Sequence, residues 1–530
     1  MSFKAICIAL LAAIALPASA QVASEGMGDL DAWGARYLET GETEFPTNLW
    51  SGSDDKTLLT LLKATKTSNL TPAERTLLRR VVLSPTRKPT GNRAEALLAE
   101  RARLMLELGE AKAAAALAPR LKQSARGLDA ETISVDLDMA SGNEASACGR
   151  LSGPVPEGTY WLKLRAVCAV LQENYSGAEL AVEFASAQGL NDPWFIEAIF
   201  AASGDVPNPP NARFDTGLNI ALSSKANLDT SRVTLSASRP DLAAAAASRP
   251  HVPPQLRARF AQIAAEIDLI SAETRRQILS ERLSDPDHTP SSSVEQALKT
   301  MLDPAATVLD KAQRLDSVLA TVKTSDMTRY SGTARLFLSD LRSLPRVRET
   351  APYALRFARA ALAAGDGALA RSWLAASDFE GIAPPDPFNI AVLEALDLIS
   401  GGEKSGASQR AIQARLLEAA KSSAQKEYTA NILTMWTGFG LSLTTDARAF
   451  LINHKSSAPR IDPFTLVAIQ SAARSGAIGE TALMVLNQTK GAPDKLSSAD
   501  LAVLIAALRR VGADDIAAGL ALEASGFWKG

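Results

Sequence analysis

Apolar residues recur at intervals of three and four along most of this chain. The rhythm is clear in three well-separated segments, which hold Leu97, Leu98, Leu104 and Leu108; Leu355, Ala358, Leu362 and Leu369; and Leu501, Leu504, Ile505 and Leu508. This spacing places the apolar side chains on one face of a helix. Alternation with a period of two, which marks a half-buried strand, is scarce. The pattern therefore predicts an all-α protein.

Alanine and leucine, rather than aromatic residues, dominate the expected core. Aromatic residues make up 5% of the chain, and alanine forms runs at 113–116 and 243–247. Alanine has the highest helix propensity and lets neighbouring helices approach closely. This composition favours packed helices over a sheet-based fold.

Several segments share the order helix, glycine, four residues, alanine, helix. The glycine and alanine pairs are Gly109 and Ala114, Gly365 and Ala370, and Gly512 and Ala517. Glycine ends a helix in a left-handed cap, and a small alanine allows the next helix to pack tightly. These segments, about five hairpins in all, resemble tetratricopeptide-type repeats, although the family's early Trp-x2-Leu-Gly signature is not cleanly present and the repeat lengths vary. The resemblance implies stacked antiparallel hairpins that form an α-solenoid; helical hairpins of no named family are the alternative.

Three stretches rich in Pro, Gly, Ser and charged residues interrupt the helical pattern. They cover residues 204–211, 284–293 and 401–406. The expected parts of the chain are a signal peptide over 1–20, an irregular N-terminal arm over 21–56, N-terminal helical hairpins over 57–204, a central region of short helices over 212–345 and a C-terminal hairpin array over 346–530.

The first twenty residues have the order of a secretory signal peptide. Lys4 precedes an apolar run from Ala5 to Leu16, Pro17 follows, and Ala-Ser-Ala ends the segment at Ala20. The run is shorter than the roughly 20 residues that span a bilayer, so an uncleaved anchor is the weaker alternative. We expect cleavage after Ala20 and a periplasmic location.

The net charge and the apolar pattern after residue 20 restrict the kinds of partner that we expect for this chain. Without Lys4 the chain holds 55 Lys and Arg against 58 Asp and Glu, a net charge near −3. No basic stripe suggests a nucleic-acid partner. No later apolar stretch approaches the length of a membrane span, so we expect no membrane insertion after signal cleavage.

Two cysteines, Cys148 and Cys168, remain after the expected cleavage. An exported protein works in an oxidising compartment, so we expect a disulfide between them. In the chain-entropy model, closing a loop of this length stabilises a protein by roughly 3 kcal/mol. Two separate buried thiols, or a pair with redox or metal chemistry, are the alternatives.

No catalytic motif stands out. His251, His288 and His454 lie far apart in Pro-rich or polar segments and are expected to be ordinary surface or loop residues. HExxH, CxxC, P-loop, GxGxxG and GxSxG motifs are absent. Glu480 and Glu523 lie in plain helical segments, where a hydrolase would need a carboxyl in an apolar setting. We therefore expect no catalytic residue, no cofactor and no metal.

Aromatic side chains are well spread along the predicted helices. We expect most of them to fill gaps between hairpins. The terminal pair, Phe527 and Trp528, either docks on the array or contacts a partner, and the sequence leaves both alternatives open. An exported helical array without a catalytic domain is most simply a scaffold or adaptor that binds another cell-envelope protein, in a motility, secretion or cell-wall assembly. A peptidoglycan-acting hydrolase, or its accessory subunit, and a polysaccharide-binding protein are the alternatives.

Overall fold

The computed structural model describes residues 32–529 apart from 122–127, 154–156, 205, 234–238, 324–325, 403–404 and 455–459. Within this part of the chain the regular structure consists of α-helices and short 3₁₀ turns, with no strand. The predicted all-α class is confirmed. The predicted signal peptide, with its cleavage point at Ala20, lies outside the described residues, as does the start of the predicted arm.

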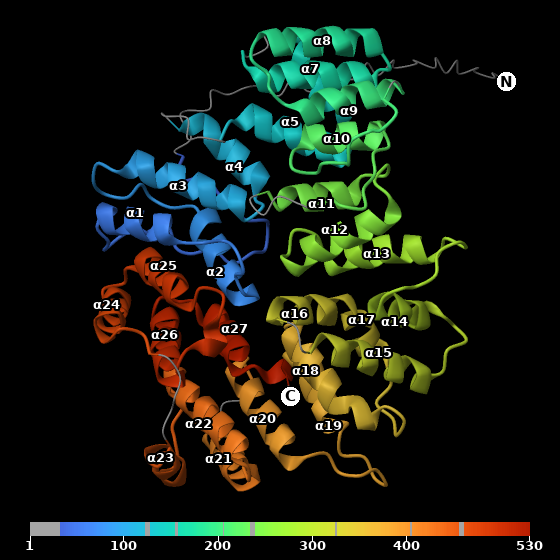
Figure 1. The fold of residues 1–530 in the computed structure, drawn as a ribbon. Coiled ribbons are helices and arrows are strands. Elements are labelled where there is room, and N and C mark those ends of the chain that lie inside the picture. Colours follow the sequence, from blue (N-terminus) through green and yellow to red (C-terminus); the bar gives the residue numbers. More distant parts are fainter. Residues whose placement is uncertain are drawn as a thin grey trace, which may run out of the picture.

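The first half of the chain, blue to green in Figure 1, forms two groups of helices. The first group comprises α1 (Asp55–Ala64), α2 (Pro72–Leu83), α3 (Ala94–Glu107) and α4 (Ala111–Leu117). The second group comprises α5 (Ala130–Ser141), α6 (Glu144–Gly149), α7 (Thr159–Leu171), α8 (Tyr175–Ala187), α9 (Pro193–Ser203), α10 (Gly217–Lys225) and α11 (Asp241–Ser248). It fills the upper part of the view, with α11 at its lower end beside α12.

The second half descends on the right of the view and returns on the left. Its descending helices are α12 (Pro254–Glu266), α13 (Ala272–Leu283), α14 (Ser293–Leu302), α15 (Val308–Val322), α16 (Met327–Leu336), α17 (Leu338–Ser343), α18 (Ala354–Ala363) and α19 (Gly367–Ala375). Its returning helices are α20 (Pro387–Ile399), α21 (Gly406–Ala419), α22 (Ser423–Gly438), α23 (Thr445–Ile452), α24 (Pro463–Arg474), α25 (Ile478–Thr489), α26 (Ser498–Arg510) and α27 (Asp514–Ser525).

The predicted hairpin turns have the expected geometry. The glycines lie in the left-handed region, with φ of +87° at Gly109, +83° at Gly365 and +80° at Gly512. Glycine adopts this conformation without the steric cost that a Cβ brings. The alanines that follow are buried against the preceding helix, with exposed fractions of 0% at Ala114, 3% at Ala370 and 0% at Ala517. The glycine–alanine signal therefore marked real helical hairpins.

The helices follow a closed course, because the two ends of the array meet. Successive contacts run from α2 through α3, α4, α5, α11, α12, α16, α18, α20 and α27, and α27 packs on α2 again. Figure 1 shows the red C-terminal helices beside the blue N-terminal ones. Two carboxylates join the ends: Glu523 accepts the backbone N–H of Ala73 at 2.7 Å, and Glu74 accepts that of Gly491 at 2.8 Å. The array is thus a ring with a polar seam.

Two apolar clusters fill the interior. The smaller is built mainly by α5–α11 and buries Trp161, Phe195 and Phe214. The larger runs through the other helices and buries Trp373 and Trp436. The smaller cluster draws on residues from 135 to 278, so it extends across the expected break at 204–211. The division into 57–204, 212–345 and 346–530 remains a prediction.

The described part of the N-terminal arm is irregular and lies on the first helices. Trp33, Phe45 and Trp50 are buried there. The backbone carbonyl of Trp33 accepts the N–H of Thr86 at 2.8 Å, just beyond the end of α2. Among the described residues, no helix combines the length and the apolar character that a membrane crossing requires.

Candidate functional site

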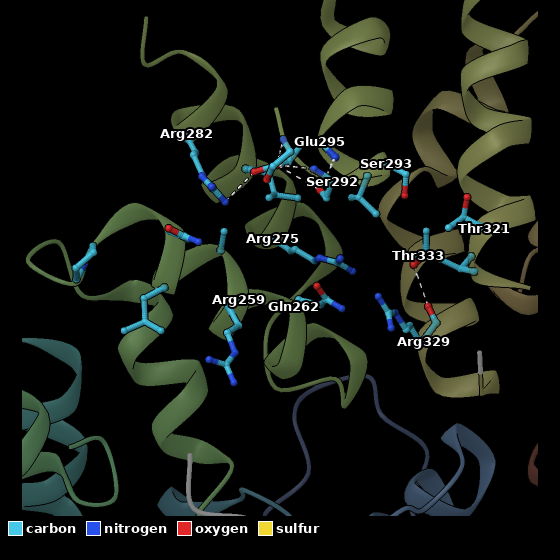
Figure 2. A pocket seen from close by; sticks show the side chains of 18 of the residues that line it. Arg259, Gln262, Arg275, Arg282, Ser292, Ser293, Glu295, Thr321, Arg329 and Thr333 are labelled. Atoms are coloured by element: carbon cyan, nitrogen blue, oxygen red, sulfur yellow. Dashed lines mark hydrogen bonds and ion pairs between the residues drawn. The ribbon is translucent and has the colours of Figure 1, made fainter. Parts of the chain in front are cut away.

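A cavity of about 850 Å³ lies between α12 and α13 on one side and α14, α15 and α16 on the other (Figure 2). Four arginines line it: Arg259 on α12, Arg275 and Arg282 on α13, and Arg329 on α16. We call it the arginine cavity. Glu295 is the only carboxylate among the described residues that line it, so the lining carries a net charge of +3. The cavity has the size of a small-molecule site.

Arg275 is the buried cation of this cavity. Its exposed fraction is 2%, and its Nη1 donates one long hydrogen bond of 3.4 Å to the carbonyl of Gly332. Its Nε–H has no hydrogen-bond partner, and no carboxylate in the described chain forms an ion pair with it. Burial lowers the pKa of Arg275 to about 10, which still leaves the guanidinium charged at neutral pH. The side chain is therefore a buried charge with incomplete compensation.

Arg329 faces Arg275 across the cavity. Figure 2 shows the two guanidinium groups pointing toward one another, with Gln262 of α12 beside them. The repulsion from Arg329 is one of the influences that lower the pKa of Arg275, after burial itself. Arg329 is exposed at its side chain. Two like charges that converge on one space create a positive potential that an anion would relieve.

Glu266 provides partial compensation from outside the cavity lining. It attracts Arg275 electrostatically, and its Oε1 accepts a hydrogen bond of 2.9 Å from Nε2 of Gln262. Burial nevertheless raises the pKa of Glu266, and this outweighs the stabilisation by Gln262, Arg275 and Arg329. Glu266 therefore supplies part of the counter-charge to Arg275 and Arg329.

In another part of the cavity, a carboxylate of the chain itself balances the charge of Arg282. Glu295, near the start of α14, accepts the backbone N–H groups of Ser291 and Ser292 at 3.0 and 3.2 Å. Its Oε1 also lies 2.8 Å from Arg282 Nη1 and 3.3 Å from His288 Nε2. Burial alone would raise the pKa of Glu295, but these donors and cations outweigh it and the pKa is lowered. Arg282 is thus held by an internal carboxylate, whereas Arg275 is not.

Arg259 stands near the rim of the cavity. Its side chain is exposed, and Nη1 donates to the carbonyl of Val233 at 3.1 Å. Thr230 and Ser231 line the cavity from the loop after α10. Guanidinium groups present planar arrays of donors and remain charged, which suits carboxylate and phosphate oxygens. The arrangement can bind and orient an anion.

The sequence predictions missed this cavity. Its arginines come from helices up to 70 residues apart, and no motif links them. One local signal was present: Arg275, Leu279 and Arg282 lie at i, i+4 and i+7, which places charge on the face of α13 that buries Leu279. His288, expected to be an ordinary loop residue, lies beside Glu295 at the edge of the site.

A second cavity, of about 570 Å³, lies where the start of α2, the end of α12 and the C-terminal residues meet. Glu523 lines it with an exposed fraction of 3%, and its Oε2 has no hydrogen-bond partner. Burial raises the pKa of Glu523 to about 8. Glu523 lies within a helix, α27, as expected, but its setting is not an ordinary one, because closure of the ring buries this face of α27.

The structure brings the two cysteines together and buries the terminal aromatic pair. Cys148 on α6 and Cys168 on α7 form a disulfide, with their Cα atoms 5.7 Å apart. Phe527 and Trp528 are buried, with exposed fractions of 2% and 4%, and their rings meet edge to face. Of the two alternatives for this pair, the structure has the docked one.

Tryptophan rings are not arranged for binding a glycan at the surface. Six of the seven tryptophans are buried, and Trp194 is half-buried. The polysaccharide alternative depended on exposed rings in a row, so it gains no support here. In the described chain, no group of three or more His, Cys, Asp or Glu side chains is placed to hold a metal ion.

Comparison with family models, with curated proteins and with solved structures finds no match to this chain.

Proposed function

We propose that this protein is an exported, non-enzymatic binding protein of the cell envelope whose helical ring holds an anionic group in the arginine cavity. The observation that carries the proposal is the buried guanidinium of Arg275, which faces a second guanidinium and lacks an ion-pair partner. Removing a charge from water costs several kcal/mol unless a partner compensates for it. An anion from outside the chain would supply that partner.

The scaffold or adaptor role belongs to the same proposal. A helical array can present an extended surface to a partner, and we propose a tetratricopeptide-like solenoid arrangement for its hairpins. We propose a periplasmic protein partner, in a motility, secretion or cell-wall assembly. Crosslinking in intact cells, followed by identification of the crosslinked protein, tests this part.

Thermal unfolding of the exported chain, residues 21–530, tests the anion site. Phosphate, sulfate, citrate and chloride are compared at one ionic strength, because salt alone screens surface charges. A ligand that binds only the folded state raises the unfolding temperature. We expect at least one multivalent anion to raise it, and Arg329→Gln to abolish the effect.

The control variant is Arg410→Gln, which removes an exposed arginine on α21 that does not line the cavity. It should respond to the anions as the wild type does. Equal responses to all four anions in the wild type, or an unchanged response in Arg329→Gln, would refute the anion site.

A hydrolase remains the second candidate, and Glu523 is the observation that favours it. A carboxyl with its pKa raised to about 8 stays protonated at neutral pH and can act as a general acid. Its Oε1 is engaged with the backbone of Ala73 at the seam, which favours a structural role. Peptidoglycan digestion by the wild type, lost in Glu523→Gln, would establish the hydrolase; we expect no digestion by either.

A further inference from the structure

We infer that the anion held in the arginine cavity is a phosphate monoester carried on a small polar body of the sugar class. The inference rests on the proposed function and specifies the ligand of the same site. It follows from three features of the cavity: the number of uncompensated charges, the directions of the donors, and the character of the remaining lining.

The uncompensated charges match a dianion. Glu295 neutralises Arg282, which leaves Arg275 and Arg329 converging on one point. A phosphate monoester carries a charge of about −1.5 to −2 at pH 7, because its second pKa is near 6. Glu266 offsets part of this charge from outside the lining, and a single carboxylate would add one charge where a phosphate monoester adds nearly two.

The donors approach from several directions. Arg275 reaches the point from α13 and Arg329 from α16, and Gln262 of α12 lies beside them with one amide N–H left after its bond to Glu266. The start of α14 adds Ser293 to the lining of the same cavity. A carboxylate is planar and accepts hydrogen bonds close to one plane, whereas the oxygens of a phosphate are arranged as a tetrahedron. Donors on three helices therefore suit a phosphate better.

The rest of the cavity suits a polar body without an aromatic ring. A phosphate group fills only a small part of about 850 Å³. The lining continues with Gln255, Ser231 and Thr230 toward Arg259 at the rim. None of the described residues that line the cavity is aromatic, so a nucleobase would find no ring on which to stack. Hydroxyl and amide groups can instead exchange hydrogen bonds with sugar hydroxyls.

Isothermal titration of the exported chain at pH 7.5 and constant ionic strength tests the inference. The probes are glucose 6-phosphate, glucose, inorganic phosphate, citrate and adenosine monophosphate. We expect glucose 6-phosphate to bind at least tenfold more tightly than each of the others. Arg329→Gln should weaken its binding at least tenfold, and Arg410→Gln should leave it unchanged. Arg329 is exposed, so its variant should retain the helical fold, which circular dichroism verifies.

The other outcomes distinguish a failure of the sugar-phosphate ligand from a failure of the anion site itself. Citrate that binds as tightly as glucose 6-phosphate, or more tightly, would overturn the phosphate inference and leave the anion site intact. Inorganic phosphate that binds as tightly as glucose 6-phosphate would overturn the sugar body, and adenosine monophosphate that does so would overturn the exclusion of an aromatic ring. If no probe binds, or if Arg329→Gln binds as the wild type does, the proposed function fails as well.

Discussion

Asp515 on α27 holds the guanidinium of Arg80 on α2 through two hydrogen bonds of 2.5 and 3.0 Å, although 435 residues separate them in sequence. Arg80 is buried, with an exposed fraction of 5%, whereas the side chain of Asp515 is partly open to solvent. The pair therefore neutralises a buried cation at the place where the ring closes. It links the C-terminal hairpin to the N-terminal one by a specific polar contact.

Asp515→Asn should weaken this closure. The substitution keeps the shape of the side chain but removes the charge that faces Arg80. A hydrogen bond to a charged group contributes about 1.5–3 kcal/mol, and partial exposure of Asp515 places the expected loss at the lower end. Urea unfolding measures it. Asp514→Asn is the matched control, because Asp514 pairs with Arg509 at an exposed position and should cost under about 1 kcal/mol. Equal losses in the two variants would contradict a role for Asp515 in closure.

The buried Glu523 should make stability depend on pH. Its pKa is about 8 in the folded protein and near 4.5 in an unfolded chain. Between these values the folded state holds a proton that the unfolded state has lost, so stability must fall as the pH rises. The contribution is fully present below about pH 4.5 and is lost as the pH passes through about 8.

Glu523→Gln isolates this contribution, since its amide oxygen can still accept the N–H of Ala73 and does not titrate. The free energy of unfolding of the wild type, relative to that of the variant, should fall between pH 6 and 9 by up to about 1.4 kcal/mol for each pH unit. Parallel pH profiles for the two proteins would show that Glu523 does not hold its proton.

Helices and hairpin turns are predictable from this sequence because their signals are local. Gly109 and Gly365 each adopt a left-handed conformation that ends a helix, as the glycine–alanine spacing indicates. Closure of the ring is not predictable in this way. Nothing in the residues around Asp515 shows which of the chain's many arginines it meets, because the pairing depends on the summed geometry of all the intervening helices.

The arginine cavity is predictable from the sequence only in part. The position of Arg275 on the buried face of α13, beside Leu279, is a local sign that a charge lies in the interior. Its approach to Arg329 is a tertiary fact, since that residue follows three helices later. A sequence can therefore indicate one member of such a site, and the fold assembles the rest.

The disulfide should stabilise the helices at the top of the ring. Cys148 and Cys168 lie 20 positions apart in the sequence, and a cross-link over this distance stabilises by roughly 3 kcal/mol in the chain-entropy model. The double variant Cys148→Ser/Cys168→Ser should unfold at correspondingly lower urea concentration, and thiol labelling of the unreduced, denatured wild type should detect no free cysteine. Two labelled cysteines in the wild type would contradict the bond.

Arg275 offers the most direct test of the central claim, that the cavity is built for an anion from outside the chain. The measurement is the free energy of unfolding of the wild type and of Arg275→Met, each with and without saturating inorganic phosphate at constant ionic strength. Replacing a buried, incompletely paired charge by an apolar side chain removes its desolvation cost. The account predicts that Arg275→Met is at least as stable as the wild type without phosphate, and that only the wild type gains stability when phosphate is added. A large loss of stability in Arg275→Met, with the gain from phosphate unchanged, would contradict it.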